Sequence, residues 1–291
     1  MKSKITVLIA ALIAVCGGFA GGTASAQSYA AGLDTAFVSK AIWRGQLLTN
    51  DWSFQPSLTV GVGGFAFNAW GTMDLAAVNT ANGITIPEDP SATPGDNDGG
   101  LKGQFSEVDY TFSYDHSFEN VSLGGGVIYY TFPQRAATLA TTSEIYGTIS
   151  LDSVPGAPNA TLYVDVDETS AGSGDKGVYF LLGAGHSFST GSDVFTSVDL
   201  SSSIGFANSG FGNFYYSLDQ GGAHDLSLSL STPITINENW SFGAFITYSA
   251  LLGDYRDAQF TDPRAVFLGT SGTPRSLAST VWGGFTMSLS F

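Results

Sequence analysis

Carboxylates are the side chains whose number and spacing in this sequence most clearly indicate a chemical role. Many of them occupy the polar positions of segments in which apolar and polar residues alternate, and only two bases accompany them. Carboxylates that line an enclosed polar space favour cations, unless bases or tyrosine hydroxyls pair with them to brace the wall. The candidate lining residues are Asp34, Lys40, Arg44, Asp74, Asp109, Asp115, Glu144, Asp165, Asp167, Asp199 and Asp225.

Arg44 ends the first alternating segment, within Ser-Lys-Ala-Ile-Trp-Arg-Gly at 39–45. A guanidinium can hold a carboxylate through two parallel hydrogen bonds. The carboxylate could belong to a solute or to an aspartate of the wall, and the sequence favours the wall-bracing ion pair. The other arginines are expected in solvated loops, with lipopolysaccharide phosphates as alternative partners. They are Arg135, Arg256, Arg264 and Arg275.

Three histidines are the candidates for hydrolytic chemistry. His116 and His186 each precede a serine, but adjacent residues of a strand point to opposite faces, so neither pair can form a base–nucleophile hydrogen bond within its strand. His224 begins a later segment. The sequence has no HExxH motif, no glycine-rich phosphate loop and no paired-acid signature. We therefore expect no enzymatic activity and no cofactor.

One acidic loop resembles the start of a calcium-binding loop. It reads Asp-Asn-Asp-Gly-Gly at 96–100, but the closing glutamate of a twelve-residue calcium loop is missing at the required spacing. Weak calcium binding by this loop stays an alternative. The prediction is an exposed turn, and no metal site is assigned.

The elements that would position these groups are β-strands. Apolar residues recur at every second position, as in the segment 65–75, where Phe65, Phe67 and Met73 alternate with Asn68 and Asp74. Successive side chains of a strand point to opposite faces of a sheet. Glycine and aromatic residues are abundant, with 37 Gly and 13% Phe, Trp and Tyr, which argues against a helical bundle.

Loop lengths favour a membrane barrel over a soluble sandwich. The connections after odd-numbered strands are long and those after even-numbered strands are short, as in bacterial outer-membrane barrels. An even number of strands also fits such a barrel. The expected strands are 31–44, 53–62, 64–77, 104–116, 119–132, 143–152, 158–168, 176–189, 193–206, 224–234, 238–251 and 278–291.

The first 26 residues are predicted to be a cleaved signal peptide. Lys2 and Lys4 precede an apolar stretch at 5–15, and Ala-Ser-Ala at 24–26 is a cleavage site. A lipoprotein signal that uses Cys16 is the less favoured alternative. Cleavage removes the single cysteine, which excludes disulfides. It also removes two of the 10 bases and none of the 25 acids, so the net charge changes from −15 to 8 − 25 = −17. This charge excludes binding to nucleic acid through its phosphates.

Aromatic residues near strand ends and an apolar last strand ending at Phe291 are consistent with a barrel embedded in lipid. The rings could form girdles at the two membrane interfaces. The last strand resembles the signal that outer-membrane barrels present to the barrel-assembly machinery. The girdle candidates are Trp43, Trp52, Tyr129, Phe132, Phe188, Trp240, Tyr248 and Trp282.

Short motifs spread over the chain resemble a known family. They include Ile-Trp-Arg-Gly at 42–45, Phe-Gln-Pro-Ser-Leu at 54–58, Phe-Ala-Phe-Asn-Ala-Trp-Gly at 65–71, Gly-Val-Ile-Tyr-Tyr-Thr-Phe-Pro at 126–133 and Glu-Ile-Tyr-Gly at 144–147. This succession is similar to the TorF-type porin family (Gcw_chp) of bacterial outer-membrane proteins. The resemblance implies a barrel named a porin from its architecture, with no established substrate and no catalytic residue.

The sequence therefore predicts an all-β protein, a transmembrane antiparallel up-and-down β-barrel of about twelve strands at 27–291, after a signal peptide at 1–26. We expect it in the cell outer membrane, as a channel for passive diffusion of ions or small polar solutes that prefers cations. The alternative is a non-conducting barrel with a structural or loop-mediated binding role. The expected partners are outer-membrane lipid, lipopolysaccharide, the barrel-assembly machinery and small solutes.

Overall fold

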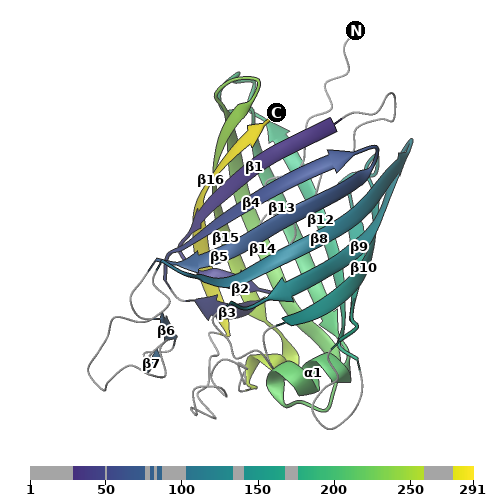
Figure 1. Ribbon diagram of the computed structural model, residues 1–291, viewed down its shortest axis with the longest axis vertical. Helices are drawn as coiled ribbons and strands as arrows, with labels where there is room; N and C mark the ends of the chain where they lie inside the picture. The colour runs from purple at the N-terminus through teal and green to yellow at the C-terminus, as the bar shows by residue number, and fades with distance from the viewer. Residues whose placement is uncertain are drawn as a thin grey trace.

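Twelve antiparallel strands close into one barrel (Figure 1). The computed structural model describes residues 29–49, 51–75, 79–81, 84–86, 103–133, 141–167, 176–258 and 278–291. The predicted signal peptide and the acidic loop 96–100 lie outside these residues, as do Arg135, Arg264 and Arg275. The fold class predicted from the sequence is confirmed.

Each strand of the barrel pairs with its neighbours in the sequence, and β1 closes the ring against β16 over a register that includes Gly32 and Ser290. The barrel strands are β1 (Tyr29–Val38), β4 (Ser53–Val62), β5 (Phe65–Asp74), β8 (Phe105–Phe118), β9 (Val121–Thr131), β10 (Thr141–Leu151), β11 (Asn159–Asp165), β12 (Val178–Ser189), β13 (Ser197–Ala207), β14 (Gly222–Thr235), β15 (Trp240–Leu251) and β16 (Ser279–Ser290).

The two ends of the barrel differ in the length of their connections. The short turns, at 63–64, 119–120, 152–158, 190–196 and 236–239, lie at the end where β1 begins and β16 finishes, at the top of Figure 1. The connections at the other end are longer. They contain the small hairpins β2 (Ala41–Trp43)–β3 (Gln46–Thr49) and β6 (Asn79–Ala81)–β7 (Ile84–Ile86), the helix α1 (Ser209–Tyr216) and the 3₁₀ helix η2 (Gly253–Arg256). We call these the short-turn end and the long-loop end.

The barrel wall is apolar outside and polar inside. Along β14, Leu228 and Leu230 are exposed, whereas Ser229 and Ser231 between them are buried. Phe65 of β5 and Phe112 of β8 are likewise exposed. A continuous apolar outer band with a polar interior is the reverse of a soluble protein and matches a barrel embedded in lipid.

The first barrel strand is shorter than the sequence suggested. The expected strand 31–44 was wrong beyond Val38, because a bend at Ser39 and Lys40 ends β1, and the chain then forms the hairpin β2–β3. Arg44 and Gly45 occupy the hairpin turn with φ of 47° and 73°. Positive φ at both turn residues is typical of tight two-residue hairpins.

Two of the tryptophans expected in the aromatic girdles face the interior instead. Trp282 is buried on the inner side of β16, where its indole N–H donates to Ser249 Oγ at 3.0 Å. Trp43 packs inside the long-loop end, with its ring 6.0 Å from that of Phe211 in α1. By contrast, Tyr129 lies on the exposed outer surface. Within the part of the chain that the structure describes, no helix is long and apolar enough to cross a membrane.

Candidate functional site: the mouth of the barrel

The hairpin β2–β3 crosses the mouth of the barrel at the long-loop end. It leaves the wall between β1 and β4, and the strands half-way round the ring from that junction are β11 and β12. Its tip reaches them, because the Arg44 guanidinium carbon lies 4.7 Å from the ring centre of Tyr163 on β11 and 4.4 Å from that of Tyr179 on β12. In Figure 1, β2 and β3 lie at the lower end of the barrel. The hairpin therefore narrows the mouth.

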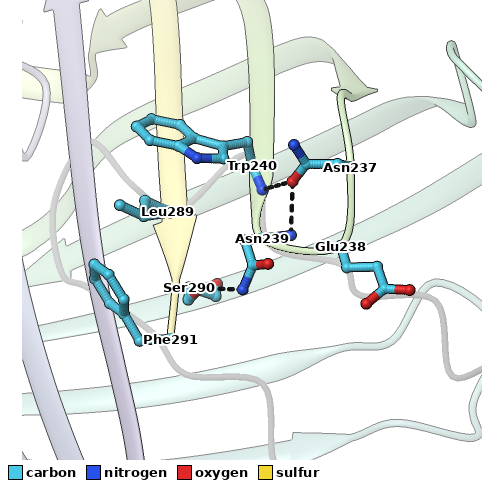
Figure 2. Close-up of a pocket in the computed structure, with 7 residues that line it drawn as sticks. All are labelled: Asn237, Glu238, Asn239, Trp240, Leu289, Ser290 and Phe291. Atoms are coloured by element: carbon cyan, nitrogen blue, oxygen red, sulfur yellow. Dashed lines mark hydrogen bonds between the residues drawn. The ribbon is translucent and has the colours of Figure 1, made fainter.

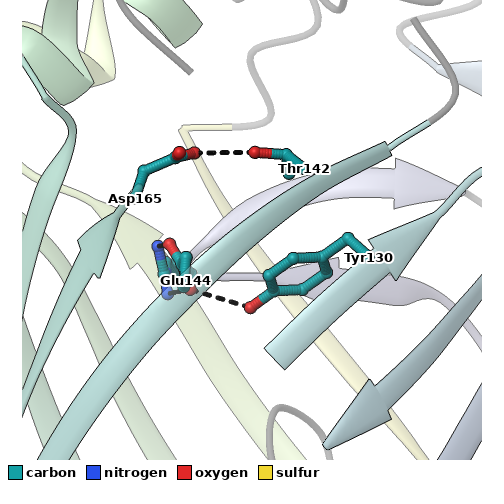
Figure 3. A network of polar contacts seen from close by, with 5 residues as sticks. Tyr130, Thr142, Glu144 and Asp165 are labelled. Atoms are coloured by element: carbon teal, nitrogen blue, oxygen red, sulfur yellow. Dashed lines mark hydrogen bonds and ion pairs between the residues drawn. The ribbon is translucent and has the colours of Figure 1, made fainter. Parts of the chain in front are cut away.

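Arg44 is fixed to the far wall by a buried ion pair with Glu144 of β10. Its Nη1 and Nη2 donate to Glu144 Oε1 and Oε2 at 2.8 and 2.7 Å, the bidentate geometry typical of the strongest arginine–carboxylate pairs. Only 3% of Arg44 is exposed. The Tyr130 hydroxyl also donates to Glu144, at 2.8 Å, and Figure 3 shows this contact beside the hydrogen bond from Thr142 to Asp165. The wall-bracing ion pair expected for Arg44 is present, with a glutamate in place of the expected aspartate.

Aromatic rings enclose the same guanidinium. The rings of Trp43 and Phe211 have their centres 4.4 and 5.7 Å from the Arg44 guanidinium carbon, and Tyr163 and Tyr179 complete the enclosure. Contacts of this kind attract a cation to the electron-rich faces of the rings. We call Tyr130, Glu144, Tyr163, Tyr179 and Phe211 the guanidinium cage; its members belong to the barrel wall and α1, not to the hairpin.

A second buried cluster lies beside the cage, around His224 of β14. A β-bulge shifts the register between β13 and β14 here, so that Asp225 pairs with Gly205 and His224 is left out of the ladder. His224 Nδ1 is 2.8 Å from Asp225 Oδ1, and its Nε2 is 3.1 Å from the Tyr216 hydroxyl. The Tyr179 hydroxyl donates to the same Asp225 oxygen at 2.7 Å. This network joins the wall of the cage to α1.

The helix α1 and the 3₁₀ helix η2 cover this cluster. Asn208 caps α1 by accepting the Phe211 amide N–H at 2.9 Å, which fixes the start of the helix. Burial raises the pKa of Tyr215 and of Tyr216 above the ordinary tyrosine value. Burial also raises the pKa of Tyr255 in η2, to about 12. These phenols therefore stay neutral at physiological pH, and the rings of Tyr216 and Tyr255 meet edge to face over the cluster.

Most of the acids predicted to line the lumen lie on the inner side of barrel strands, but they differ in exposure. The buried ones have hydrogen-bond partners, and all of them except Asp199, which lies on β13 near the short-turn end, lie toward the long-loop end. Asp74 accepts hydrogen bonds from Thr49 of the hairpin and from Ser53 of β4, at 2.9 and 3.4 Å. The buried acids of the set are Asp74, Glu144, Asp165, Asp199 and Asp225. The partly exposed ones are Asp34, Asp109 and Asp115.

Two predicted lining residues lie off the barrel strands. Asp167 was expected on the inner face of a strand extending to 168, but β11 ends at Asp165 and Asp167 is exposed beyond it. The backbone N–H of Asp167 donates to the Asp165 carboxylate at 3.0 Å, an interaction that turns the chain away from the wall. Lys40 lies in the bend between β1 and β2.

The inner faces of β9 and β12 become more buried toward the mouth. On the inner face of β9, Gly124 is partly exposed, whereas Ile128 and Tyr130 are buried. On the inner face of β12, Gly185 is partly exposed and Tyr179 is buried. The most completely buried part of this inner wall therefore coincides with the hairpin and the cage.

A shallow depression lies at the opposite, short-turn end. Trp240, Leu289 and Phe291 line it, together with the turn residues Asn237 to Asn239 (Figure 2). Asn239 Nδ2 donates to the Ser290 carbonyl at 2.7 Å and so ties this turn to the last strand. The depression lies on the outer side of the wall, away from the cage.

Sequence patterns alone did not indicate the cage rings or the buried network around His224. Tyr163 and Tyr179 read as inward positions of ordinary strands, and Phe211 lies in a connection where no helix was expected. The available local signal was the Trp-Arg-Gly sequence at 43–45, in which glycine follows arginine as in a tight hairpin turn. The partners of that turn are far away in the chain.

Three solved structures illustrate what this chain resembles. It is similar to the NanC porin (11% identity, 88% of this chain and 98% of that one, TM-score 0.46), to an anion-selective porin from Comamonas acidovorans (11%, 91% and 99%, 0.39) and to an outer membrane channel from Pseudomonas putida F1 (9%, 92% and 97%, 0.45). No protein-family model matches the chain, and no curated protein does. The resemblance to the TorF-type family is therefore not confirmed, and similarities this distant assign no function.

Proposed function

We propose that the protein is a porin-like channel of the bacterial outer membrane that lets ions and small polar solutes diffuse passively and prefers cations. The observation that carries this proposal is the polarity of the closed barrel, which is apolar outside and lined by carboxylates inside. Rings of carboxylates raise the local concentration of cations and repel anions. Asp34 and Asp115, both partly exposed inside the barrel, are the groups best placed to act on a solute.

Planar-bilayer recordings in a salt gradient test the proposal. We expect discrete conductance steps. We also expect a reversal potential whose sign shows that cations are more permeant than anions. Replacing Asp34 and Asp115 together by asparagine should move the reversal potential toward zero, whereas Asp193→Asn, an exposed position in the turn 190–196, should leave it unchanged. Anion preference in the unmodified protein would refute the proposed selectivity.

The hairpin across the mouth favours a second candidate, a barrel that conducts little at rest. A variant in which a short Gly-Ser linker replaces residues 41–49 separates the two. Conductance that appears only in this variant indicates a closed resting state. A folded barrel that conducts in neither form refutes the channel and supports a structural or binding role.

A further inference from the structure

The guanidinium cage and its occupant come from different parts of the chain. Glu144 and Tyr163 belong to the barrel wall and Phe211 to α1, whereas Arg44 arrives on a hairpin anchored at the opposite side of the mouth. If the hairpin is removed, the buried carboxylate is left facing the three aromatic rings that contact the guanidinium. Such a set of groups is complementary to an organic cation.

We propose that this cage is a binding site for the guanidinium group of a solute, and that Arg44 is a built-in occupant which such a solute displaces. The inference rests on the proposed channel function, because it assigns a solute class to the mouth of the same barrel. A solute that takes the place of Arg44 releases the tip of β2–β3 and widens the mouth.

The geometry selects a planar guanidinium over other cations. Both terminal nitrogens of Arg44 reach one oxygen each of Glu144, which a single ammonium nitrogen cannot reproduce. Rings lie within 6 Å of the same carbon from β11, β12 and α1. Among the described residues, nothing accepts a hydrogen bond from Arg44 Nε, the nitrogen that joins the guanidinium to its own side chain. The cage therefore forms hydrogen bonds only with the two terminal nitrogens, Nη1 and Nη2, of the Arg44 guanidinium. A free guanidinium compound carries the same two nitrogens.

The acidic surroundings support a cationic solute. Asp225 accepts a hydrogen bond from Tyr179 of the cage, and the chain carries a formal charge of −15. A negative mouth attracts cations and repels anions before either reaches the cage.

Binding of methylguanidinium to the detergent-folded Arg44→Gly variant tests the inference directly. Glycine suits the positive φ of the turn and leaves the cage vacant. Isothermal titration calorimetry at constant ionic strength should show saturable binding of methylguanidinium to Arg44→Gly. The double variant Arg44→Gly, Glu144→Gln should bind it at least about tenfold more weakly, because two charge-assisted hydrogen bonds are weakened. The unmodified protein and the matched control Arg256→Gly, an exposed arginine of η2 at the same end, should also bind at least about tenfold more weakly, because Arg44 fills the cage in both.

A second cage variant guards against effects of the Glu144 substitution on folding. Tyr163→Leu in the Arg44→Gly background keeps an apolar side chain but removes one ring face, and binding should weaken several-fold. Retention of the folded band in unheated electrophoresis establishes that each variant is a closed barrel. Equal affinity of Arg44→Gly and the unmodified protein for methylguanidinium would overturn the inference.

Bilayer recordings separate this inference from the channel proposal. Methylguanidinium added at the long-loop end should raise the conductance of the unmodified protein, while equimolar potassium should not. If no variant conducts, including the one without the hairpin, the channel proposal fails while the calorimetric result still decides the binding site. If the barrel conducts but Arg44→Gly does not bind methylguanidinium, only the inference fails.

Discussion

Loss of the Glu144 carboxylate should release the hairpin from the far wall. Glu144→Ala leaves the Arg44 guanidinium buried without its counter-charge, and it also removes the hydrogen bond from the Tyr130 hydroxyl to Glu144. Removing one partner of a buried ion pair costs about 3–5 kcal/mol. The hairpin can avoid this cost by moving into solvent. The loss of the ion pair therefore shifts the equilibrium from the docked hairpin toward the released one.

Trypsin reports this equilibrium, because cleavage after Arg44 requires the side chain to leave the cage. With fast opening and closing, the cleavage rate follows the released population, so about 3–5 kcal/mol corresponds to an increase of about a hundredfold to several thousandfold. Digestion of the folded barrel in detergent, followed by mass spectrometry of the fragment that begins at Gly45, measures the rate. The exposed Arg256 provides a reference site in the same molecule.

The control variant is Asp167→Ala, which removes an exposed acid at the same end of the barrel. It should leave the ratio of cleavage after Arg44 to cleavage after Arg256 unchanged. An unchanged ratio in Glu144→Ala as well would show that the ion pair does not hold the hairpin. Equally rapid cleavage at both sites in the unmodified protein would show that the hairpin is not docked in solution.

Three further predictions concern stability. A Cβ at Gly126 would lie 2.3 Å from the Phe112 carbonyl oxygen, so Gly126→Ala should lower the unfolding free energy in urea by about 1–3 kcal/mol. A Cβ at Gly147, on the next strand, would meet nothing within 4 Å, so Gly147→Ala should not lower that free energy. Gly45→Ala should undock the hairpin and expose the site after residue 44 to trypsin, because its Cβ would lie 2.6 Å from a side-chain carbon of β14 and its φ is +73°. Since burial raises the pKa of Tyr255 to about 12, above the value of about 10 in an unfolded chain, stability should fall as the pH rises from about 10 to 12. Tyr255→Phe should remove that part of the pH dependence in thermal melts.

The barrel itself could be predicted because each strand carries its own evidence. Alternation such as that of Leu228 to Ser231 depends only on which face meets lipid, and the sorting of loop lengths depends only on chain order. The hairpin could not be predicted in this way. Its residues Ala41, Ile42 and Leu47 are apolar and buried like those of a strand, so the pattern seemed to continue past the bend.

The cage depends on contacts that leave no local trace. Glu144 is 100 positions from Arg44, and neither residue's neighbours indicate the other. The residue type of the tryptophans also failed to predict whether their side chains face the lipid or the interior. Trp43 and Trp282 were expected in the interfacial girdles because tryptophan favours them, but the indoles fill space inside the barrel and one of them donates a hydrogen bond there.

The acidic composition consequently divides into two groups with different physical roles. Near the long-loop end, Glu144 pairs with Arg44, Asp225 accepts from Tyr179, and Asp74 accepts from Thr49. These carboxylates hold the cap and hairpin in place, and neutralising one of them should change gating before it changes selectivity. Asp34 and Asp115 are partly exposed inside the barrel, and in the proposed channel a carboxylate there would act on a passing ion through its field. Mutations in the first group should therefore alter how often the mouth opens, and those in the second which ions pass once it has opened.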